Sequence, residues 1–333
     1  MKKLLNLLLV AVMSLTLVFS LSACNRDYEG EINVYVVDGA PALAFSKLMH
    51  EENKLGKESV SYNVIKSPSP SDASENISTV VATKKATVAL LPINLAVKLA
   101  GTGKDYKILS VNTHGNLYGL SKNYEFSSLN DLKGKKVGVI QMANVPGLTF
   151  KAILNNASIA FTENENELNA DKVFLKNIEP TQIGQLLTSG AIDFAVSAEP
   201  QVSTLTTNAP AIKKVFSLQN LWGETSYPQA VVLVKSELAK DKDFCDALLS
   251  ALDESATWVK TNGATAFDAI SAHCVEGYST SLNKNTLTEN AIVGCNIKCV
   301  KASKMKETIT DYMNKINAVG ASSFGTPSDN FFA

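Results

Sequence analysis

Short apolar runs rich in β-branched residues alternate along the chain with segments of helical periodicity. Ile32–Val37 ends at the turn 38–41 and continues into the apolar segment 42–48, and Lys136–Ile140 leads through a short turn into a helix that Pro146 opens. An apolar run that ends at a turn and continues with a 3.6-residue period is typical of a strand followed by a helix. The pattern predicts strands at 32–37, 61–65, 87–91, 106–111, 117–120, 136–140, 192–196 and 230–234, and helices at 42–48, 72–83, 95–100, 127–134, 147–154, 181–187, 201–206, 243–258 and 303–316.

This alternation predicts an α/β protein with mixed, mainly parallel sheets flanked by helices. Two successive strand–helix sets are followed by one more strand and a mainly helical tail. Because the tail must pack against an earlier part of the chain, we expect the chain to build one domain, cross to a second and return. Ligands of such folds bind beyond the carboxyl ends of the strands, so the turns after the strands are the candidate binding elements.

The N-terminus has the features of a secretory signal. Lys2 and Lys3 precede an apolar run that extends from Leu4 to Phe19. A charged start followed by an apolar stretch of this length is typical of a secreted protein. An uncleaved membrane anchor is the alternative, but the run is at the short end of the roughly 20 residues that a spanning helix needs.

The signal ends in Leu21-Ser22-Ala23-Cys24. Small residues before a cysteine resemble the lipobox of bacterial lipoproteins, in which the cysteine sulfur is acylated and cleavage leaves that cysteine first. We therefore expect residues 1–23 to be a lipoprotein signal peptide, Cys24 to be the lipid attachment point and residues 24–31 to be a polar tether. Later apolar runs are too short to span a bilayer.

Four further cysteines lie in the C-terminal third of the chain, at positions 245, 274, 295 and 299. An even number outside the cytoplasm permits two disulfides in any of three pairings, and buried free thiols are the alternative. Their spacing does not distinguish between the two. Cys295 and Cys299 have no histidine beside them, so they are a weak metal signal.

Charge and composition exclude several function classes. The formal net charge is -1, from 31 basic and 32 acidic residues, and no polybasic run is present, so nucleic acid is not an expected partner. The three histidines, His50, His114 and His273, lie far apart in sequence, and we expect no metal site and no cofactor. The sequence has no nucleophile elbow, phosphate-binding loop, zincin motif or dinucleotide fingerprint. We therefore expect a protein that is not an enzyme.

Three motifs resemble those of a known family. Asp38-Gly39-Ala40-Pro41 follows the first strand, the run Leu-Asn-Asp-Leu-Lys-Gly-Lys-Lys-Val-Gly-Val occupies 129–139, and Gly-Ala-Ile-Asp-Phe-Ala-Val at 190–196 precedes Glu199-Pro200. With the lipobox, they resemble the ABC-transporter substrate-binding lipoproteins of the nitrate/sulfonate/bicarbonate and thiamine-pyrimidine group. The resemblance covers about residues 31–320.

The resemblance implies the two-lobed fold of type-2 periplasmic binding proteins, in which a cleft between the lobes closes on a small-molecule solute. It also implies a monomer that is tethered by lipid outside the cytoplasm and delivers the solute to an ABC permease. We expect lobe 1 to comprise residues 32–114 plus 229–333 and lobe 2 to comprise residues 115–228. The crossings are expected near 111–117 and 226–231.

Three strand-to-helix turns, at 38–42, 141–148 and 197–201, are the candidate ligand contacts. A helix start offers unpaired N–H groups to a carboxylate, sulfonate or carbonyl. Arg26 is the only arginine and lies in the tether, which disfavours a sulfonate or nitrate. The expected ligand-binding residues are Asp38, Gly39, Ala40, Pro41, Asn94, His114, Tyr118, Gln141, Asn144, Val145, Pro146, Gly147, Glu199, Tyr227 and Gln229.

Within this set, Asp38 and Glu199 would accept hydrogen bonds from a heteroaromatic solute such as a pyrimidine, and Tyr118 or Tyr227 would stack on it. Structural roles are the alternative for several of these residues, because Asp38 and Glu199 can cap helices and Asn144 can form a turn. Two other functions also stay open. One is a sensor or adhesion lipoprotein, and the other is an enzyme on the same fold, such as a pyrimidine synthase, although an enzyme of that kind would not need a lipobox.

Overall fold

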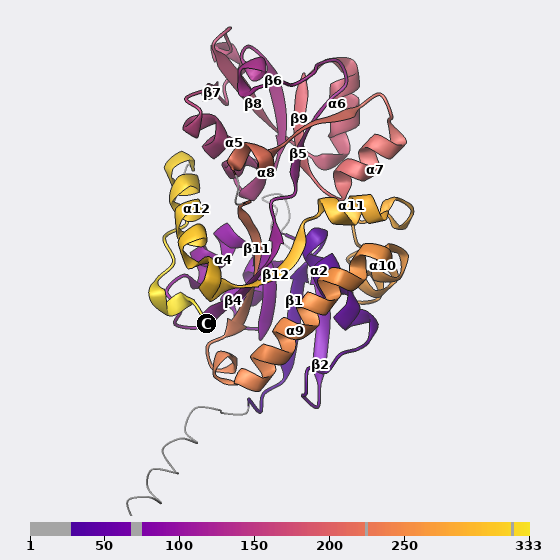
Figure 1. The fold of residues 1–333 in the computed structure, drawn as a ribbon, viewed down its shortest axis with the longest axis vertical. Helices are drawn as coiled ribbons and strands as arrows, with labels where there is room; N and C mark the ends of the chain where they lie inside the picture. Colours follow the sequence, from indigo (N-terminus) through magenta and orange to yellow (C-terminus); the bar gives the residue numbers. More distant parts are fainter. Residues whose placement is uncertain (1–27, 68–74, 224–225, 321–322) are drawn as a thin grey trace, which may run out of the picture.

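Two six-stranded sheets, each flanked by helices, form the two halves of the molecule (Figure 1). The computed structural model describes residues 28–67, 75–223, 226–320 and 323–333. The expected signal peptide at 1–23, the lipid attachment at Cys24 and the first part of the tether lie outside the described residues. Within them, no helix is long and apolar enough to cross a membrane.

The first sheet has the strand order β12-β4-β11-β3-β1-β2. Its strands are β1 (Ile32–Val37), β2 (Val60–Ile65), β3 (Val88–Pro92), β4 (Tyr106–His114), β11 (Pro228–Lys235) and β12 (Ile297–Lys301). β1 runs parallel to β2 and β3, whereas β11 pairs antiparallel with both β3 and β4. Helices cover both faces, which explains why β1, β3 and β11 read as nearly continuous apolar runs.

The second sheet has the order β10-β5-β9-β6-β8-β7. Its strands are β5 (Leu117–Ser121), β6 (Lys136–Ile140), β7 (Ala160–Thr162), β8 (Lys172–Ile178), β9 (Phe194–Ala198) and β10 (Lys213–Ser217). β6 runs parallel to β8 and β9, and β5 pairs antiparallel with β9. The two sheets thus share one design. In each sheet, the first strand after the chain crosses from the other sheet pairs antiparallel with its neighbours, and this strand is β5 in the second sheet and β11 in the first.

Helices from distant parts of the sequence cover the first sheet. The α-helices of the described residues are α2 (Ala40–His50), α3 (Ile77–Ala82), α4 (Ile93–Ala100), α5 (Val145–Asn156), α6 (Ile183–Ser189), α7 (Gln201–Asn208), α8 (Leu218–Trp222), α9 (Lys242–Trp258), α10 (Gly263–Ala272), α11 (Glu289–Gly294) and α12 (Lys306–Val319). α2 packs against α9 and α10 over the face that carries Val34 and Val36. α3, α4 and α12 cover the opposite face, which carries Tyr35 and Val37.

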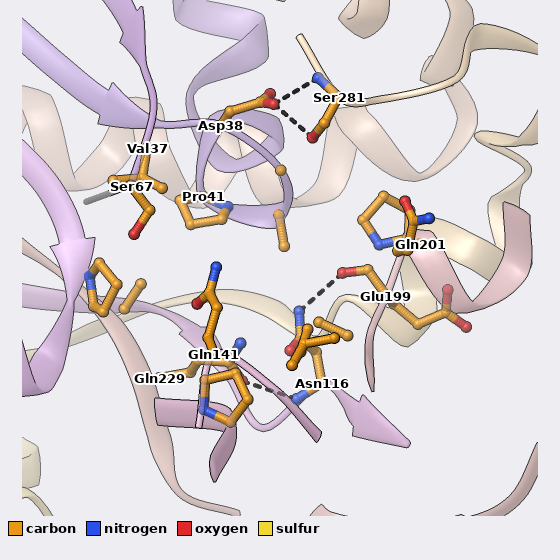
Figure 2. A pocket seen from close by; sticks show the side chains of 18 of the residues that line it. Val37, Asp38, Pro41, Ser67, Asn116, Gln141, Glu199, Gln201, Gln229 and Ser281 are labelled. Carbon is orange, nitrogen blue, oxygen red and sulfur yellow. Dashed lines mark hydrogen bonds between the residues drawn. The ribbon is translucent and has the colours of Figure 1, made fainter. Parts of the chain in front are cut away.

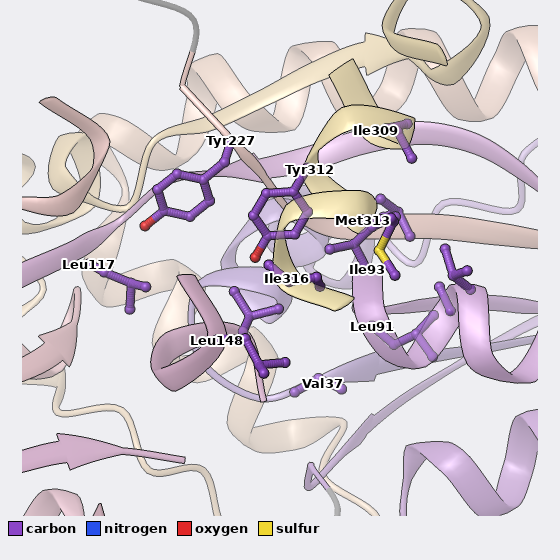
Figure 3. Packing of buried hydrophobic residues seen from close by; sticks show 14 of the residues in the cluster. Val37, Leu91, Ile93, Leu117, Leu148, Tyr227, Ile309, Tyr312, Met313 and Ile316 are labelled. Carbon is purple, nitrogen blue, oxygen red and sulfur yellow. The ribbon is translucent and has the colours of Figure 1, made fainter. Parts of the chain in front are cut away.

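One apolar cluster continues from the first sheet into the second (Figure 3). α12 contributes Tyr312 and Met313 to it and packs against α5, which contributes Leu148. The Tyr312 ring stacks on Tyr227 with centroids 5.8 Å apart. The C-terminal helix therefore joins the two halves of the molecule.

Several expectations about individual elements need correction. The segment 127–134 forms only a single 3-10 turn at Leu129–Leu132, because the backbone becomes extended at Lys133 and Gly134 has a φ of 71°. The expected helix at 72–83 forms only at 77–82 within the described residues, where Asn76 caps it by accepting from two backbone N–H groups. The mainly helical C-terminal region also contains the strand β12, and the strands β7, β8 and β10 were not expected.

The four cysteines of the C-terminal third are free thiols. Cys245 and Cys295 are buried, and burial raises the pKa of both thiols, that of Cys245 to about 11. A buried thiol with a raised pKa is unreactive, because the thiolate is the nucleophilic form. The sequence left open two disulfides or free thiols, and in the structure the four cysteines are free thiols.

Candidate functional site

A cavity of about 320 Å³ lies between the two sheets, and both sheets contribute to its wall (Figure 2). The end of β1 and the turn after it, at 37–41, face the end of β6 and the start of α5, at 140–146. The turn after β9 and the returning strand β11 complete the wall. The carboxyl ends of parallel strands from both sheets thus meet at one cavity, as expected for this class of fold.

The turn after β1 is held by its own chain. Asp38 Oδ2 accepts from the Tyr278 hydroxyl at 2.9 Å and from the Ser281 backbone N–H at 2.7 Å. Thr280 donates to Oδ1 at 2.6 Å, and the Ser281 hydroxyl donates to Oδ2 at 2.6 Å. The carboxylate therefore fixes the loop 278–281 to the cavity wall. Burial, together with the Asp38 charge, raises the pKa of Tyr278 well above its ordinary value.

Two helices begin at the cavity without a side-chain cap. α2 starts after Gly39, whose φ of 95° lies in the region that favours glycine, and α5 starts after Asn144. Each helix has a proline in its first turn, Pro41 and Pro146. The N–H groups of an uncapped first turn and the positive end of the helix dipole favour a solute acceptor or negative charge.

In the turn after β9, the Glu199 carboxylate points away from the centre of the cavity (Figure 2). Glu199 is 2% exposed. Lys214 donates to its Oε1 at 2.8 Å, and the Ser203 hydroxyl donates to the same atom at 3.0 Å. The Ser203 backbone N–H donates to Oε2 at 2.9 Å. This carboxylate therefore pairs with a lysine and accepts from the start of α7, while Glu199 remains part of the cavity wall.

The two crossing segments meet at the floor of the cavity. The Asn116 backbone N–H donates to Gln229 Oε1 at 3.2 Å, and Asn116 Nδ2 donates to the Glu199 carbonyl at 3.1 Å. The Glu199 N–H in turn donates to the Asn116 carbonyl at 3.0 Å. Asn116 therefore connects the first crossing, the second crossing and the turn after β9.

Nine of the expected residues line the cavity and six do not. Those that line it are Asp38, Gly39, Ala40, Pro41, Gln141, Val145, Pro146, Glu199 and Gln229. Those that do not are Asn94, His114, Tyr118, Asn144, Gly147 and Tyr227. The turns expected to face the cleft are at its wall, whereas the residues chosen for ring stacking are elsewhere.

Both tyrosines expected to stack on a solute are engaged by protein. Tyr227 is fully buried between Trp222 and Tyr312, so its ring is part of the core. The Tyr118 ring lies under Lys214 Nζ at 4.0 Å, and its hydroxyl donates to the Gly294 carbonyl at 3.1 Å. Burial, with Glu199 nearby, raises the pKa of Tyr118 to about 12. In this structure Tyr227 is a residue of the core, and Tyr118 makes a contact between the two sheets.

Three polar or small residues also act away from the cavity. Asn94 Nδ2 donates to Asn144 Oδ1 at 3.3 Å, which links α4 to the start of α5 across the two sheets. Gly147 is buried against the Met142 backbone, where a Cβ would lie 2.2 Å from the carbonyl oxygen. Close packing, not ligand contact, therefore explains this glycine.

His114 is buried at the end of β4. Burial, with a contribution from the charge of Lys298, lowers its pKa to about 4. The imidazole is therefore neutral at pH 7, and it does not line the cavity.

The sequence reasoning missed part of the wall. The additional lining residues are Val37, Ser67, Pro92, Asn116, Ile140, Ala198, Pro200, Gln201, Thr204, Ala230, Tyr278, Ser281 and Leu282. Many are neighbours of expected residues on the same strands or turns. The segment 278–282 has no local signal, because it reaches the cavity through its bonds to Asp38.

Among the described residues, no group of three or more histidine, cysteine, aspartate or glutamate side chains could hold a metal ion. The wall of the cavity instead carries carboxamides and hydroxyls between apolar side chains. Gln141, Gln201 and Gln229 are the three glutamines of this wall. Such a surface is suited to hydrogen bonding a small polar molecule.

The family model described as NMT1/THI5 like matches residues 65–266, which is more than half of the chain. This chain belongs to the NMT1/THI5-like family. The resemblance found in the sequence is thereby confirmed. No curated protein sequence matches the chain significantly.

Solved structures of the same fold cover nearly the whole chain. An ABC transporter protein from Parabacteroides distasonis has a TM-score of 0.68 and 19% identity over 91% of this chain and 98% of its own. The periplasmic aliphatic sulphonate-binding protein SsuA of Escherichia coli has a TM-score of 0.62 and 13% identity, over 89% and 95%. The zinc-bound ligand-binding component of an import system from Staphylococcus aureus has a TM-score of 0.59 and 14% identity, over 92% and 97%. The NMT1/THI5-like chain therefore has the predicted two-lobed fold of the periplasmic binding proteins, and these relatives are named as transport proteins, not as enzymes.

Proposed function

We propose that this protein is the extracytoplasmic solute-binding component of an ABC importer and that it closes two lobes on a small organic molecule. The observation that carries the proposal is the cavity of about 320 Å³ with a wall drawn from both sheets. A solute that fills it contacts both lobes at once, so it binds the closed arrangement better than an open one. Its volume is within the range of small-molecule sites, at the lower end.

Closure supplies the signal for transport. To change a population from 1:99 to 99:1, the solute must bind the closed state better by about 5.5 kcal/mol. Contacts made to both lobes only in the closed state are the source of that difference. The lobes of this proposal are residues 32–114 plus 229–333 and residues 115–228, and the permease would recognise the closed form.

Two classes of solute suit the cavity. The uncapped starts of α2 and α5 suit a sulfonate-like or nitrate-like anion, and the Escherichia coli relative is named as a sulphonate-binding protein. The carboxamide-rich wall suits a neutral heteroaromatic such as a pyrimidine precursor of thiamine. We favour the second class, because no lysine, arginine or histidine is among the described residues that line the cavity.

The N-terminal sequence supports attachment to a membrane. In this proposal, residues 1–23 are removed as a signal peptide, Cys24 carries the lipid and residues 24–31 tether a monomer to the outer face of the membrane. Since α2 to α12 and both sheets lie beyond the tether, the lipid would not interfere with the cavity.

The test is native mass spectrometry of the full-length protein expressed in a bacterial host, followed by denaturation to release any bound molecule. We expect a small solute that dissociates unaltered and raises the melting temperature when it is added back. A solute that is chemically converted would instead indicate an enzyme. An empty protein whose melting temperature no metabolite in a broad panel raises would contradict the proposal and favour a sensor or adhesion lipoprotein.

A further inference from the structure

Asn116 has one polar atom without a partner, at the place where the chain crosses between the lobes. Its side chain is 1% exposed and lines the cavity. Its backbone N–H, its backbone carbonyl and its Nδ2 are all bonded to Gln229 or to the Glu199 backbone. Within the part of the chain that the structure describes, Oδ1 accepts no hydrogen bond.

The identity of that free atom is determined by its neighbours. The other side-chain atom of Asn116 lies 3.1 Å from the Glu199 carbonyl oxygen, so it must be the NH₂ group, which donates. The remaining atom is therefore the carbonyl oxygen. A buried carbonyl oxygen that has lost its water is costly unless a donor reaches it. Asn116 is one of the residues that line the cavity, so a bound solute is the donor nearest at hand.

The charges of the cavity wall also favour a solute that donates a hydrogen bond. Asp38 is negative and is bonded only to neutral donors among the described residues, whereas the Glu199 charge is balanced by Lys214. The cavity therefore has a net negative wall, although the first turns of α2 and α5 supply donors to a solute acceptor. A solute that carries both a donor and an acceptor matches these groups better than a simple anion does.

We propose that Asn116 Oδ1 accepts a hydrogen bond from an N–H group of the solute, and that the solute is an uncharged molecule with an amide or amino group, not a sulfonate or nitrate. This inference rests on the proposed function and assigns the ligand class of the same cavity. Asn116 is then the residue that determines specificity, because a site built to bond an N–H group rejects an analogue that lacks it.

The same bond connects binding to the crossing segments. Asn116 already joins the second crossing through Gln229 and the lobe-2 turn through Glu199. A solute N–H group bonded to Oδ1 adds a fourth bond to this set, at a residue of the first crossing segment. The solute therefore stabilises the arrangement of the crossings as well as filling the cavity.

The test uses isosteric pairs of probes, which differ in one N–H donor, and isothermal titration calorimetry of the full-length protein. 4-Aminopyrimidine is compared with 4-methylpyrimidine and 2-pyrrolidone with cyclopentanone, and ethanesulfonate and nitrate form the anionic arm. For at least one pair we expect the donor-bearing probe to bind about tenfold more tightly than its isostere. In Asn116→Ala that preference should fall below about twofold, as a result of removing the acceptor.

Asn112→Ala is the matched control. Asn112 is also 1% exposed and also has one unpartnered side-chain atom, Nδ2, but it does not line the cavity. The control should lower the melting temperature and keep the preference between isosteres, since a merely structural role would affect both probes of a pair equally.

Three results would overturn the assignment. A preference that persists in Asn116→Ala removes Asn116 from the site. Ethanesulfonate or nitrate binding more tightly than every donor-bearing probe, or a co-purifying solute without an N–H group, overturns the ligand class and leaves the proposed function in place. A protein that carries no solute and binds no probe or metabolite contradicts the inference together with the proposed function.

Discussion

Asp38 illustrates how a carboxylate at a cavity wall can be fully used by the protein. Four donors from Tyr278, Thr280 and Ser281 reach its two oxygens at 2.6 to 2.9 Å. The sequence alone favours a ligand role for this residue, because an acidic side chain after a strand faces the cleft in folds of this kind. The geometry indicates that its main role is to hold the loop 278–281 in place.

Asp38→Asn tests this role. An amide accepts at only one of its two atoms, and its NH₂ group would face donors, so we expect the free energy of unfolding to fall by about 1–3 kcal/mol. Urea denaturation measures it. Asp329→Asn is the control, because Asp329 is 90% exposed in its side chain, and its loss should cost less than about 0.5 kcal/mol. Unchanged stability with a tenfold loss of solute affinity would return Asp38 to a ligand-contact role.

The sequence predicts which turns face the cavity but not which side chains point into it. The three turns follow strands, and the ends of parallel strands share one edge, so their positions follow from the strand pattern. The direction of the Glu199 carboxylate depends on its ion pair with Lys214. The Tyr227 ring is unavailable for stacking on a solute because it stacks on Tyr312. Those partners are distant in sequence, and no local pattern brings them together.

At the scale of elements, the periodicity of α12 predicts the helix but not its partner. Its buried residues, Ile309, Tyr312, Met313 and Ile316, have the i, i+3, i+4, i+7 spacing of one helix face. That face packs against α5 of the other half, where the Tyr312 and Thr149 hydroxyls lie 2.7 Å apart. The strands β8, β10 and β12 were missed because each contains two lysines and has an apolar run of at most three residues.

The contact between Tyr312 and Thr149 can be measured by a double-mutant cycle. Both residues are fully buried, so Tyr312→Phe or Thr149→Val leaves one hydroxyl without a partner, and we expect each change to cost about 1–2 kcal/mol. The double variant should be more stable than the sum of the two losses predicts, by about 1 kcal/mol. Strict additivity of the unfolding free energies would mean that the two hydroxyls do not interact.

The start of α9 depends on the charge of Asp241. This carboxylate accepts from the Phe244 N–H at 3.0 Å and from the Tyr28 N–H at 3.0 Å, and pairs with Lys57 at 2.5 Å. Burial alone would raise the pKa of Asp241, but Lys57 and the two N–H groups outweigh it, so the pKa is lowered. The cap therefore joins the N-terminal segment, the α2–β2 connection and α9.

Asp241→Asn should remove a pH-dependent part of the stability. A carboxylate whose pKa is lowered on folding stabilises the fold above its unfolded pKa, about 3.9, and this contribution is lost as the pH falls through the folded value. We expect the variant to be less stable than the wild type by about 2–3 kcal/mol at pH 7, with a smaller difference at pH 3. Urea denaturation at both values measures the change. A difference that is the same at pH 7 and pH 3 would assign the effect to packing instead of charge.

For the whole molecule, two kinds of contact join the lobes. On one side, α12 and α5 share a continuous apolar cluster. Elsewhere, single hydrogen bonds cross between the lobes, from the Tyr118 hydroxyl to Gly294 at 3.1 Å and between the Thr204 and Thr286 hydroxyls at 2.6 Å. Because an apolar cluster is costly to separate and a single hydrogen bond is not, opening should begin on the side of the hydrogen bonds and turn about the α12–α5 contact.

A double variant, Tyr118→Phe with Thr286→Val, tests this direction of opening. Neither substituted residue lines the cavity, so the change removes no side chain from the cavity wall. We expect it to disfavour the closed state by about 1 kcal/mol, which corresponds to a roughly fivefold rise in the Kd of the co-purified solute. Small-angle scattering of the solute-free variant should give a larger radius of gyration. Thr206→Val is the matched control, since its hydroxyl donates to the Val202 carbonyl within α7, and it should change neither quantity. If the double variant keeps the wild-type affinity and radius, the hydrogen bonds do not oppose opening, and the α12–α5 cluster alone must set the balance between open and closed forms.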